Sequence, residues 1–296
     1  MPELDFEYVP SGASARAEAI ACDGLVDGAG LHASHWAGNR TPDELKADTS
    51  VEIALRLVER GIPRGALITN NHFDTDGVLA VLALLEPDLA LRHAALLTAA
   101  AEAGDFDEWP ADDRGLRLDM AIRALAARAG GEREAYARTL PALGELLADI
   151  DARRDLWEPE WQALLAAERR AAEGTLGVER HGRVAVFLHR PGADELPGPV
   201  LSRRAPEGST RWLLAFEQAD GGWQYRYERP RWAWADTVVR PRVPSPSRNA
   251  IAQDLGEGWA LKGSLGMTGL LRTSGAVTME PPEVLAALLR RDVGAR

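Results

Sequence analysis

The chain has 296 residues with 34 basic and 45 acidic side chains, which gives a formal net charge of −11. Such an acidic chain is a poor general binder of nucleic acid or anionic membrane, and no stretch approaches the ~20 apolar residues that a membrane span needs. The N-terminal residues lack the basic head and apolar run of a secretory signal, and a single cysteine, Cys22, excludes a disulfide framework. We expect a cytoplasmic protein with an ordinary globular core.

The charge is unevenly distributed along the chain. Residues 1–175 carry 17 basic and 32 acidic side chains, a net of −15, whereas residues 176–296 carry 17 basic and 13 acidic ones, a net of +4. An acidic part that neutralises its carboxylates with metal and a basic part that presents arginines would together suit a small anionic substrate. Long nucleic acid stays excluded as a partner.

Residues 1–113 predict an α/β domain with a parallel sheet, because strand, loop and helix follow one another. The expected elements are a strand at 18–22, a helix at 48–60 that begins at Asp48 or Thr49, a strand at 66–69, a buried helix at 78–86, a helix at 90–103 and an acidic loop from Glu102 to Asp113.

The rest of the chain divides into a helical spacer and a second domain. Residues 114–175 contain three amphipathic stretches, at 114–129, 132–149 and 159–173, and form the predicted spacer. Residues 176–296 predict a smaller α+β domain, with hairpins around His181-Gly182 and Asp220-Gly221-Gly222 and a last helix at 281–291.

The run NNHFDTDG, residues 70–77, is the clearest candidate site. His72, Asp74 and Asp76 alternate, so an extended chain would place all three on one side. Two carboxylates at this spacing repel each other unless a cation lies between them, and the mixed nitrogen and oxygen donors suit Mn²⁺ or a related divalent ion. The alternative is a turn in which the aspartates bond their own backbone and cap the next helix.

The run His72-Phe73-Asp74-Thr75-Asp76-Gly77, followed by VLAVLALL, resembles the first motif of the DHH phosphoesterase superfamily over about 20 residues. The resemblance implies hydrolysis of phosphoesters or phosphoanhydrides with Mn²⁺ or Mg²⁺. The Asp-His-His motif itself is absent, and Ser34-His35-Trp36 stands in a similar setting. The combination of SHWAGNRTPDEL with NHFDTDG also looks like an uncharacterised bacterial family.

The same resemblance implies three further metal ligands. Asp23 lies at a strand end, where the superfamily places a lone metal-binding aspartate, and Asp105 resembles its late aspartate. His35 takes the place of the missing motif, in an order along the chain that would be permuted. The remaining competitors are His32 for His35 and Asp107 for Asp105, and each position also has an ordinary role in a turn or loop.

The resemblance implies two-metal hydrolysis, with His72, Asp74, Asp76 and His35 in the catalytic centre and a cation-activated water as the nucleophile. Arginine recognises phosphate through paired hydrogen bonds. The arginines expected to bind the substrate are Arg203, Arg204, Arg240 and Arg248. The loops 245–250 and 263–269 could also present backbone N–H groups to an anion.

Two other functions fit the same residues. A degenerate site could bind an anionic metabolite without turnover, in which case the protein is a non-catalytic binding module. A metal-dependent hydrolase that acts on a bond without phosphorus is also compatible, because the donor set does not name the substrate.

Overall fold

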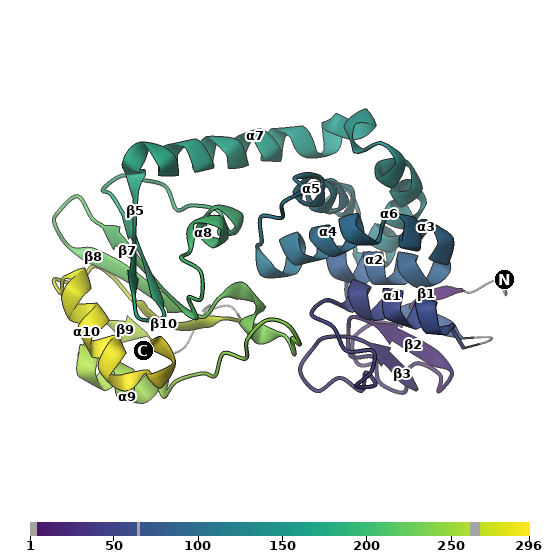
Figure 1. Cartoon of the computed structure of the whole chain (residues 1–296), viewed down its shortest axis with the longest axis horizontal. Helices are drawn as coiled ribbons and strands as arrows, with labels where there is room; N and C mark the ends of the chain where they lie inside the picture. Colours follow the sequence, from purple (N-terminus) through teal and green to yellow (C-terminus); the bar gives the residue numbers. More distant parts are fainter. Residues whose placement is uncertain (1–4, 64–65, 261–266) are drawn as a thin grey trace. The chain divides into compact units, whose positions relative to one another are not determined.

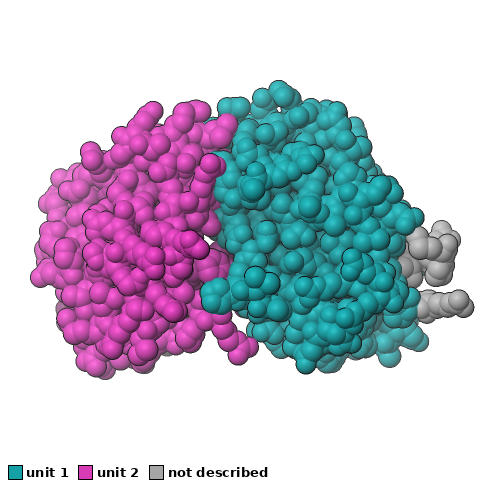
Figure 2. Space-filling view, viewed as in Figure 1, with its two compact units in different colours: residues 1–163, 235–241 teal, residues 164–234, 242–296 magenta. Residues whose placement is uncertain are grey.

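The computed structural model of the chain describes residues 5–63, 66–260 and 267–296. It forms two compact units, which Figure 2 colours separately. Unit 1 comprises Met1–Ala163 and Ala235–Pro241, and unit 2 comprises Leu164–Trp234 and Arg242–Arg296. The helical segment predicted as a spacer is therefore divided, and most of it belongs to unit 1.

A parallel four-stranded sheet in the order β1-β4-β2-β3 lies in unit 1 (Figure 1). Its strands are β1 (Phe6–Tyr8), β2 (Ala19–Cys22), β3 (Leu31–Ala33) and β4 (Leu67–Asn70). All of β2 is buried and apolar, and β4 is buried from Ile68 onward, where it ends in the polar residues Thr69 and Asn70. Because the strands are parallel, the segments that follow β2, β3 and β4 emerge at one edge of the sheet.

The helices of unit 1 pack on this sheet and on one another. They are α1 (Ser50–Arg60), α2 (Thr75–Leu85), α3 (Pro87–Arg92), α4 (Ala94–Phe106), α5 (Arg114–Ala126) and α6 (Glu132–Ala148). Helix α2 contacts β2 and β4 on one side and α1 and α4 on others, so it is buried from Thr75 to Leu84. Within the described ranges, no helix is long and apolar enough to cross a membrane.

Three local expectations need correction. Helix α2 begins at Thr75, because the Asp74 side chain accepts a hydrogen bond from the backbone N–H of Gly77 and caps the helix, so His72, Asp74 and Asp76 do not form one extended row. The helix expected at 90–103 is two helices that meet at His93. The expected acidic loop is helical as far as Phe106, which places Asp105 in the last turn of α4.

Unit 2 contains a mixed six-stranded sheet in the order β5-β6-β7-β8-β10-β9. Its strands are β5 (Leu176–His181), β6 (Val184–His189), β7 (Arg211–Glu217), β8 (Trp223–Glu228), β9 (Trp259–Ala260) and β10 (Gly269–Thr273). The pairs β5-β6 and β7-β8 are the two predicted hairpins. The strands β6 and β7 pair in parallel, and the chain between them contains α8 (Gly198–Arg204).

One hydrophobic core joins this sheet to α9 (Arg248–Leu255) and α10 (Pro281–Arg291), and it includes Leu213, Ile251 and Val284. Helix α10 has the predicted bounds. The chain has a parallel sheet in its first part and a separate mixed sheet, packed against helices, in its last part. This arrangement confirms the predicted fold class. Helix α7 (Arg154–Arg170) begins in unit 1 and ends in unit 2.

A buried ion pair links two segments of unit 2. The Arg211 guanidinium donates to both carboxylate oxygens of Asp292, at 2.5 and 3.0 Å, and both side chains are 1% exposed. The Tyr227 hydroxyl donates to the same carboxylate at 2.8 Å. The sheet and the C-terminal segment are thereby joined by a charge pair whose polar atoms are hydrogen-bonded.

We predict that Asp292→Ala lowers the free energy of unfolding of unit 2 by about 3–5 kcal/mol, because it leaves the Arg211 guanidinium buried without its counter-charge. Urea unfolding followed by tryptophan fluorescence measures the change. Asp254→Ala is the matched control, since Asp254 pairs with the half-exposed Arg291 at 2.7 Å, and its removal is expected to change stability far less than Asp292→Ala does. Equal effects of the two substitutions would contradict the prediction.

Candidate metal centre

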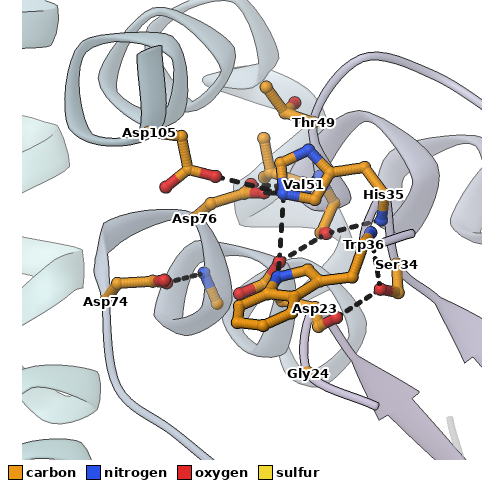
Figure 3. Close-up of polar contacts among 12 residues, drawn as sticks. Asp23, Gly24, Ser34, His35, Trp36, Thr49, Val51, Asp74, Asp76 and Asp105 are labelled. Carbon is orange, nitrogen blue, oxygen red and sulfur yellow. Dashed lines mark hydrogen bonds and ion pairs between the residues drawn. The ribbon is translucent and has the colours of Figure 1, made fainter. Parts of the chain in front are cut away.

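The edge of the unit 1 sheet brings together all six residues expected to hold metal, which we call the cluster. Figure 3 labels five of them, all except His72. Asp23 follows β2, His35 follows β3 and His72 follows β4, so each comes from the carboxyl end of a parallel strand. The first turn of α2 and the last turn of α4 supply the remaining carboxylates. These are Asp74 and Asp76 at α2 and Asp105 at α4.

Four of these residues form a group that we call the buried group: Asp23, His35, Asp76 and Asp105. Their ligand atoms all lie within 4.8 Å of one another. The His35 Nε2 atom is 3.3 Å from Asp23 Oδ1, 3.6 Å from Asp76 Oδ2 and 3.1 Å from Asp105 Oδ2. The four side chains are between 0% and 6% exposed, so the group is closed to bulk water.

Asp23 also belongs to a second group, the open group, with His72 and Asp74. The His72 Nε2 atom is 2.7 Å from Asp23 Oδ2 and 3.0 Å from Asp74 Oδ2. The His72 side chain is 21% exposed and that of Asp74 is 36% exposed. The Asp23 carboxylate thus directs one oxygen to each group, and solvent reaches the pair of groups from the side of His72 and Asp74.

The backbone at Asp23 is held in a conformation that non-glycine residues rarely adopt, with a φ of 61°. Its Oδ1 accepts hydrogen bonds from the Ser50 hydroxyl at 2.8 Å and from the Trp36 indole N–H at 3.1 Å. Such strain persists where surrounding contacts impose it, and it concentrates at functional sites. Here it turns a fully buried carboxylate from the end of β2 toward both groups.

The N-terminus of α1 holds Asp76. The backbone N–H groups of Ser50 and Val51 donate to its two carboxylate oxygens at 2.6 and 2.8 Å, where the helix dipole also favours negative charge. Gly77 is required beside it, because a Cβ at this position would lie 2.6 Å from the amide nitrogen of Asn70. The absence of a side chain at Gly77 therefore lets the first turn of α2 pass close to Asn70.

Both histidines direct the Nε2 atom at the carboxylates. The Nδ1 atom of His35 is 2.6 Å from the backbone oxygen of Asp48 and carries the hydrogen, since a carbonyl oxygen can only accept. The Nδ1 atom of His72 is 3.2 Å from the side-chain oxygen of Asn71. Metal-binding histidines are oriented in this way, with the nitrogen opposite the metal bonded to an oxygen.

The pKa values in the cluster follow from burial and mutual repulsion. Burial, reinforced by the Asp74 carboxylate, raises the pKa of Asp105 to about 7. Burial and the Asp105 carboxylate raise the pKa of Asp76 well above its usual range. Burial alone would lower the pKa of His72, but its hydrogen bonds to Asp23 and Asp74 outweigh burial and raise this pKa to about 11. In the absence of a cation, these groups therefore keep protons that offset the negative charge. A bound cation would take over that role.

The two competing residues lie outside both groups. The Nδ1 atom of His32 accepts a hydrogen bond from the backbone N–H of Arg40 at 3.1 Å, so this imidazole is used within the loop. Asp107 ends α4 in the left-handed conformation. His35 and Asp105 are therefore the members of each pair that reach the cluster.

The predicted substrate-binding arginines are dispersed. Arg203 and Arg204 end α8, where Arg204 pairs with Glu168 at 2.9 Å, and Arg248 begins α9 at the surface. Arg240 lies in unit 1, paired with carboxylates there.

A cavity of about 790 Å³ in unit 2 is lined by other residues, among them His189, Phe216 and Arg226. Most of the loop at 263–269 falls outside the described residues. The contacts of these arginines with a substrate remain predictions.

Sequence reasoning missed the residues that orient the ligands. Ser50, Trp36 and Asp48 all contact Asp23 or His35, but the sequence pattern indicates Asp48 only as a possible helix cap and Trp36 only as a neighbour of His35. Thr49 is the actual cap of α1 and forms a capping box with Glu52. The sequence signal that was available, an Asp-Thr-Ser run before an apolar helix, predicts a helix start and says nothing of a neighbouring strand end.

We predict that the cation-free protein becomes less stable as the pH rises from 5 to 8. The pKa of Asp105 is about 7 in the folded protein, against a usual 3.8, and that of His72 is about 11, against 6.5. The folded state therefore holds protons that the unfolded chain releases, and stability falls with rising pH by about 1 kcal/mol or more. Melting temperatures in chelator measure this trend.

Asp105→Asn is the control for that trend, because it removes the carboxyl group and should flatten the slope below pH 7. Saturating Mn²⁺ should reverse the slope, since a cation competes with the protons. A melting temperature in chelator that rises steadily over this pH range would contradict the assignment.

Comparison with known proteins places the chain in a family. No curated protein sequence matches it. A family model described as a family of unknown function, DUF6687, matches residues 4–279, which is most of the chain and includes all six residues of the cluster. The chain belongs to the DUF6687 family.

Proposed function

We propose that the protein is a divalent-metal-dependent hydrolase that cleaves a phosphate ester or anhydride bond in a small anionic substrate. The observation that carries the proposal is the pair of ligand groups joined by Asp23. Carboxylate and imidazole donors in this ratio suit Mn²⁺ or Mg²⁺ better than metals that prefer sulfur. Two cations that share a carboxylate are a recurrent arrangement in enzymes that transfer phosphoryl groups.

The two groups differ in the number of protein ligands and in their access to solvent. The buried group offers one imidazole and three carboxylates and would hold its cation away from solvent. The open group offers His72 and Asp74 beside the shared Asp23, which leaves fewer protein ligands and more access for a substrate oxygen or a water. We therefore expect the substrate to approach from the side of His72 and Asp74.

When bound, the cations would lower the pKa of a coordinated water and stabilise the charge that develops on the phosphoryl oxygens. The chain supplies orientation. Trp36 donates to Asp23 and its ring centroid lies 5.0 Å from that of His72, so it forms a wall of the open group. Cys22 is unsuited to be a nucleophile, because burial raises the pKa of its thiol.

The choice of phosphorus rests on the resemblance of residues 72–77 to the first DHH phosphoesterase motif, because the donor set alone does not select it. A permuted chain order is compatible with that resemblance. Parallel strands bring their carboxyl ends to one edge whatever their order along the chain, and the segments after β2, β3 and β4 meet there.

The decisive experiment measures cation binding and turnover together. The purified chain, loaded with Mn²⁺ or Mg²⁺, is incubated with pyrophosphate, aryl phosphate mono- and diesters, mononucleotides and cyclic dinucleotides. We predict cation-dependent release of product from at least one of these substrates. Asp23→Asn should lower the rate by at least about 100-fold, because it removes the negative charge shared by both cations and replaces one of the two carboxylate oxygens by an NH2 group that cannot bind a cation.

Asp112→Asn is the matched control, since Asp112 is exposed and pairs only with Arg114 among the contacts described here, and it should leave the rate unchanged. A chain that binds no divalent cation, and whose melting temperature responds to Mn²⁺ equally with and without Asp74→Asn, would overturn the proposal. Binding of a phosphate compound without product would instead indicate a non-catalytic binding module.

A further inference from the structure

A short segment from the second half of the chain forms part of unit 1. Ala235–Pro241, which we call the strap, belongs to unit 1, although the residues before and after it belong to unit 2. The strap contacts one of the predicted metal ligands directly. The backbone N–H of Asp236 donates a hydrogen bond to the backbone oxygen of His35 at 2.7 Å. His35 is a member of the buried group.

The strap also encloses the carboxylate of Asp48. The backbone N–H groups of Val238, Val239 and Arg240 donate to it, the last two at 2.7 and 3.1 Å, and the Arg240 guanidinium adds a fourth donor at 2.7 Å. Asp48 is 3% exposed. Four donors on one buried carboxylate fix the position of this residue. Its backbone oxygen is the acceptor for His35 Nδ1, so the same contacts determine how His35 is presented.

The rest of the Arg240 guanidinium engages the end of α4. Its Nε donates to Glu108 at 2.9 Å and its Nη2 to Glu102 at 2.7 Å, and its central carbon lies 4.7 Å from the centroid of the Phe106 ring. These three residues lie on both sides of Asp105 in the chain. Arg240 therefore secures the turn that carries a second ligand of the buried group.

We infer that Arg240 is a positioning residue for two ligands of the buried group. It orients His35 through Asp48, and it orients Asp105 through the last turn of α4. The inference rests on the proposed function only in taking this group as a cation site. His72 and Asp74 are oriented by other contacts, with Asn71 and with the start of α2. Arg240 should thus affect one of the two cations and spare the other. Its donors are used within the protein, which differs from the substrate contact expected from the sequence.

The sign of the effect separates positioning from simple electrostatics. Removing a positive charge beside a cation site would strengthen cation binding if charge alone mattered. Removing a residue that orients two ligands weakens binding, and the loss of such supporting contacts commonly costs 10–100-fold in metal affinity. The two explanations therefore predict opposite changes.

The test is a Mn²⁺ titration of the full chain, monitored by calorimetry and by electron paramagnetic resonance. We expect two binding events in the original protein. In Arg240→Gln, one event should weaken by about 10–100-fold and the other should stay within about threefold. Arg240→Lys keeps the charge but cannot reproduce the fork-shaped contacts, so it should also weaken that event. Arg153→Gln is the control, since Arg153 is also partly buried and bridges Glu145 and Asp155, and it should change neither event.

Several results would overturn the inference: two unchanged events, two equally weakened events, tighter binding in Arg240→Gln, or full affinity in Arg240→Lys. A second measurement needs no metal. The His35 Nδ1 proton, hydrogen-bonded to the Asp48 oxygen, should give a protected downfield proton resonance that disappears in Arg240→Gln and persists in Arg153→Gln. If the original protein bound no Mn²⁺, the proposed function would fail, whereas retention of that resonance in Arg240→Gln would refute the positioning role by itself.

Discussion

The concentration of buried negative charge at one edge of a parallel sheet is the constraint on which unit 1 depends. Four aspartates share this space with only two imidazoles, and two unit charges 4 Å apart repel each other by about 4 kcal/mol even at an effective dielectric constant of 20. The chain compensates partly with the N-terminus of α1 on Asp76 and with the Ser50 hydroxyl on Asp23. The remainder is met by retained protons or, as proposed here, by two divalent cations.

The surroundings of the cluster follow from that constraint. Asp23 reaches both ligand groups with its backbone held in the left-handed region, and Gly77 keeps the entrance to α2 free of a side chain that would contact Asn70 too closely. Arg240, which lies far from the cluster in sequence, pairs with three further carboxylates, on Asp48, Glu102 and Glu108, and offsets part of their negative charge. The centre is thus supported both by the sheet edge and by the strap.

The sequence predicted the six clustered residues but not what orients them. Asp23 and His72 each follow a short strand, and such strand ends converge in a parallel sheet. The local pattern indicated His72, whereas the resemblance to the phosphoesterase superfamily implied Asp23. The expectation of an extended row at 72–76 was wrong because Asp74 caps a helix. The sequence pattern Asp-x-Asp-Gly is compatible with either role. The contact between Asp48 and Arg240 joins residues 192 positions apart, and no periodicity or motif reports such a pairing. Arg240 was predicted to bind the substrate, whereas the structure pairs it with the protein's own carboxylates.

The most direct test of this account is a crystal structure of the protein grown with Mn²⁺, with anomalous diffraction data used to locate the metal. The account predicts two anomalous peaks about 3.5–4 Å apart, on either side of the Asp23 carboxylate. One peak should lie among the buried group, and the other should lie beside His72 and Asp74. A single peak, or none at a Mn²⁺ concentration that saturates binding in solution, would contradict the central claim that one aspartate joins two cation sites.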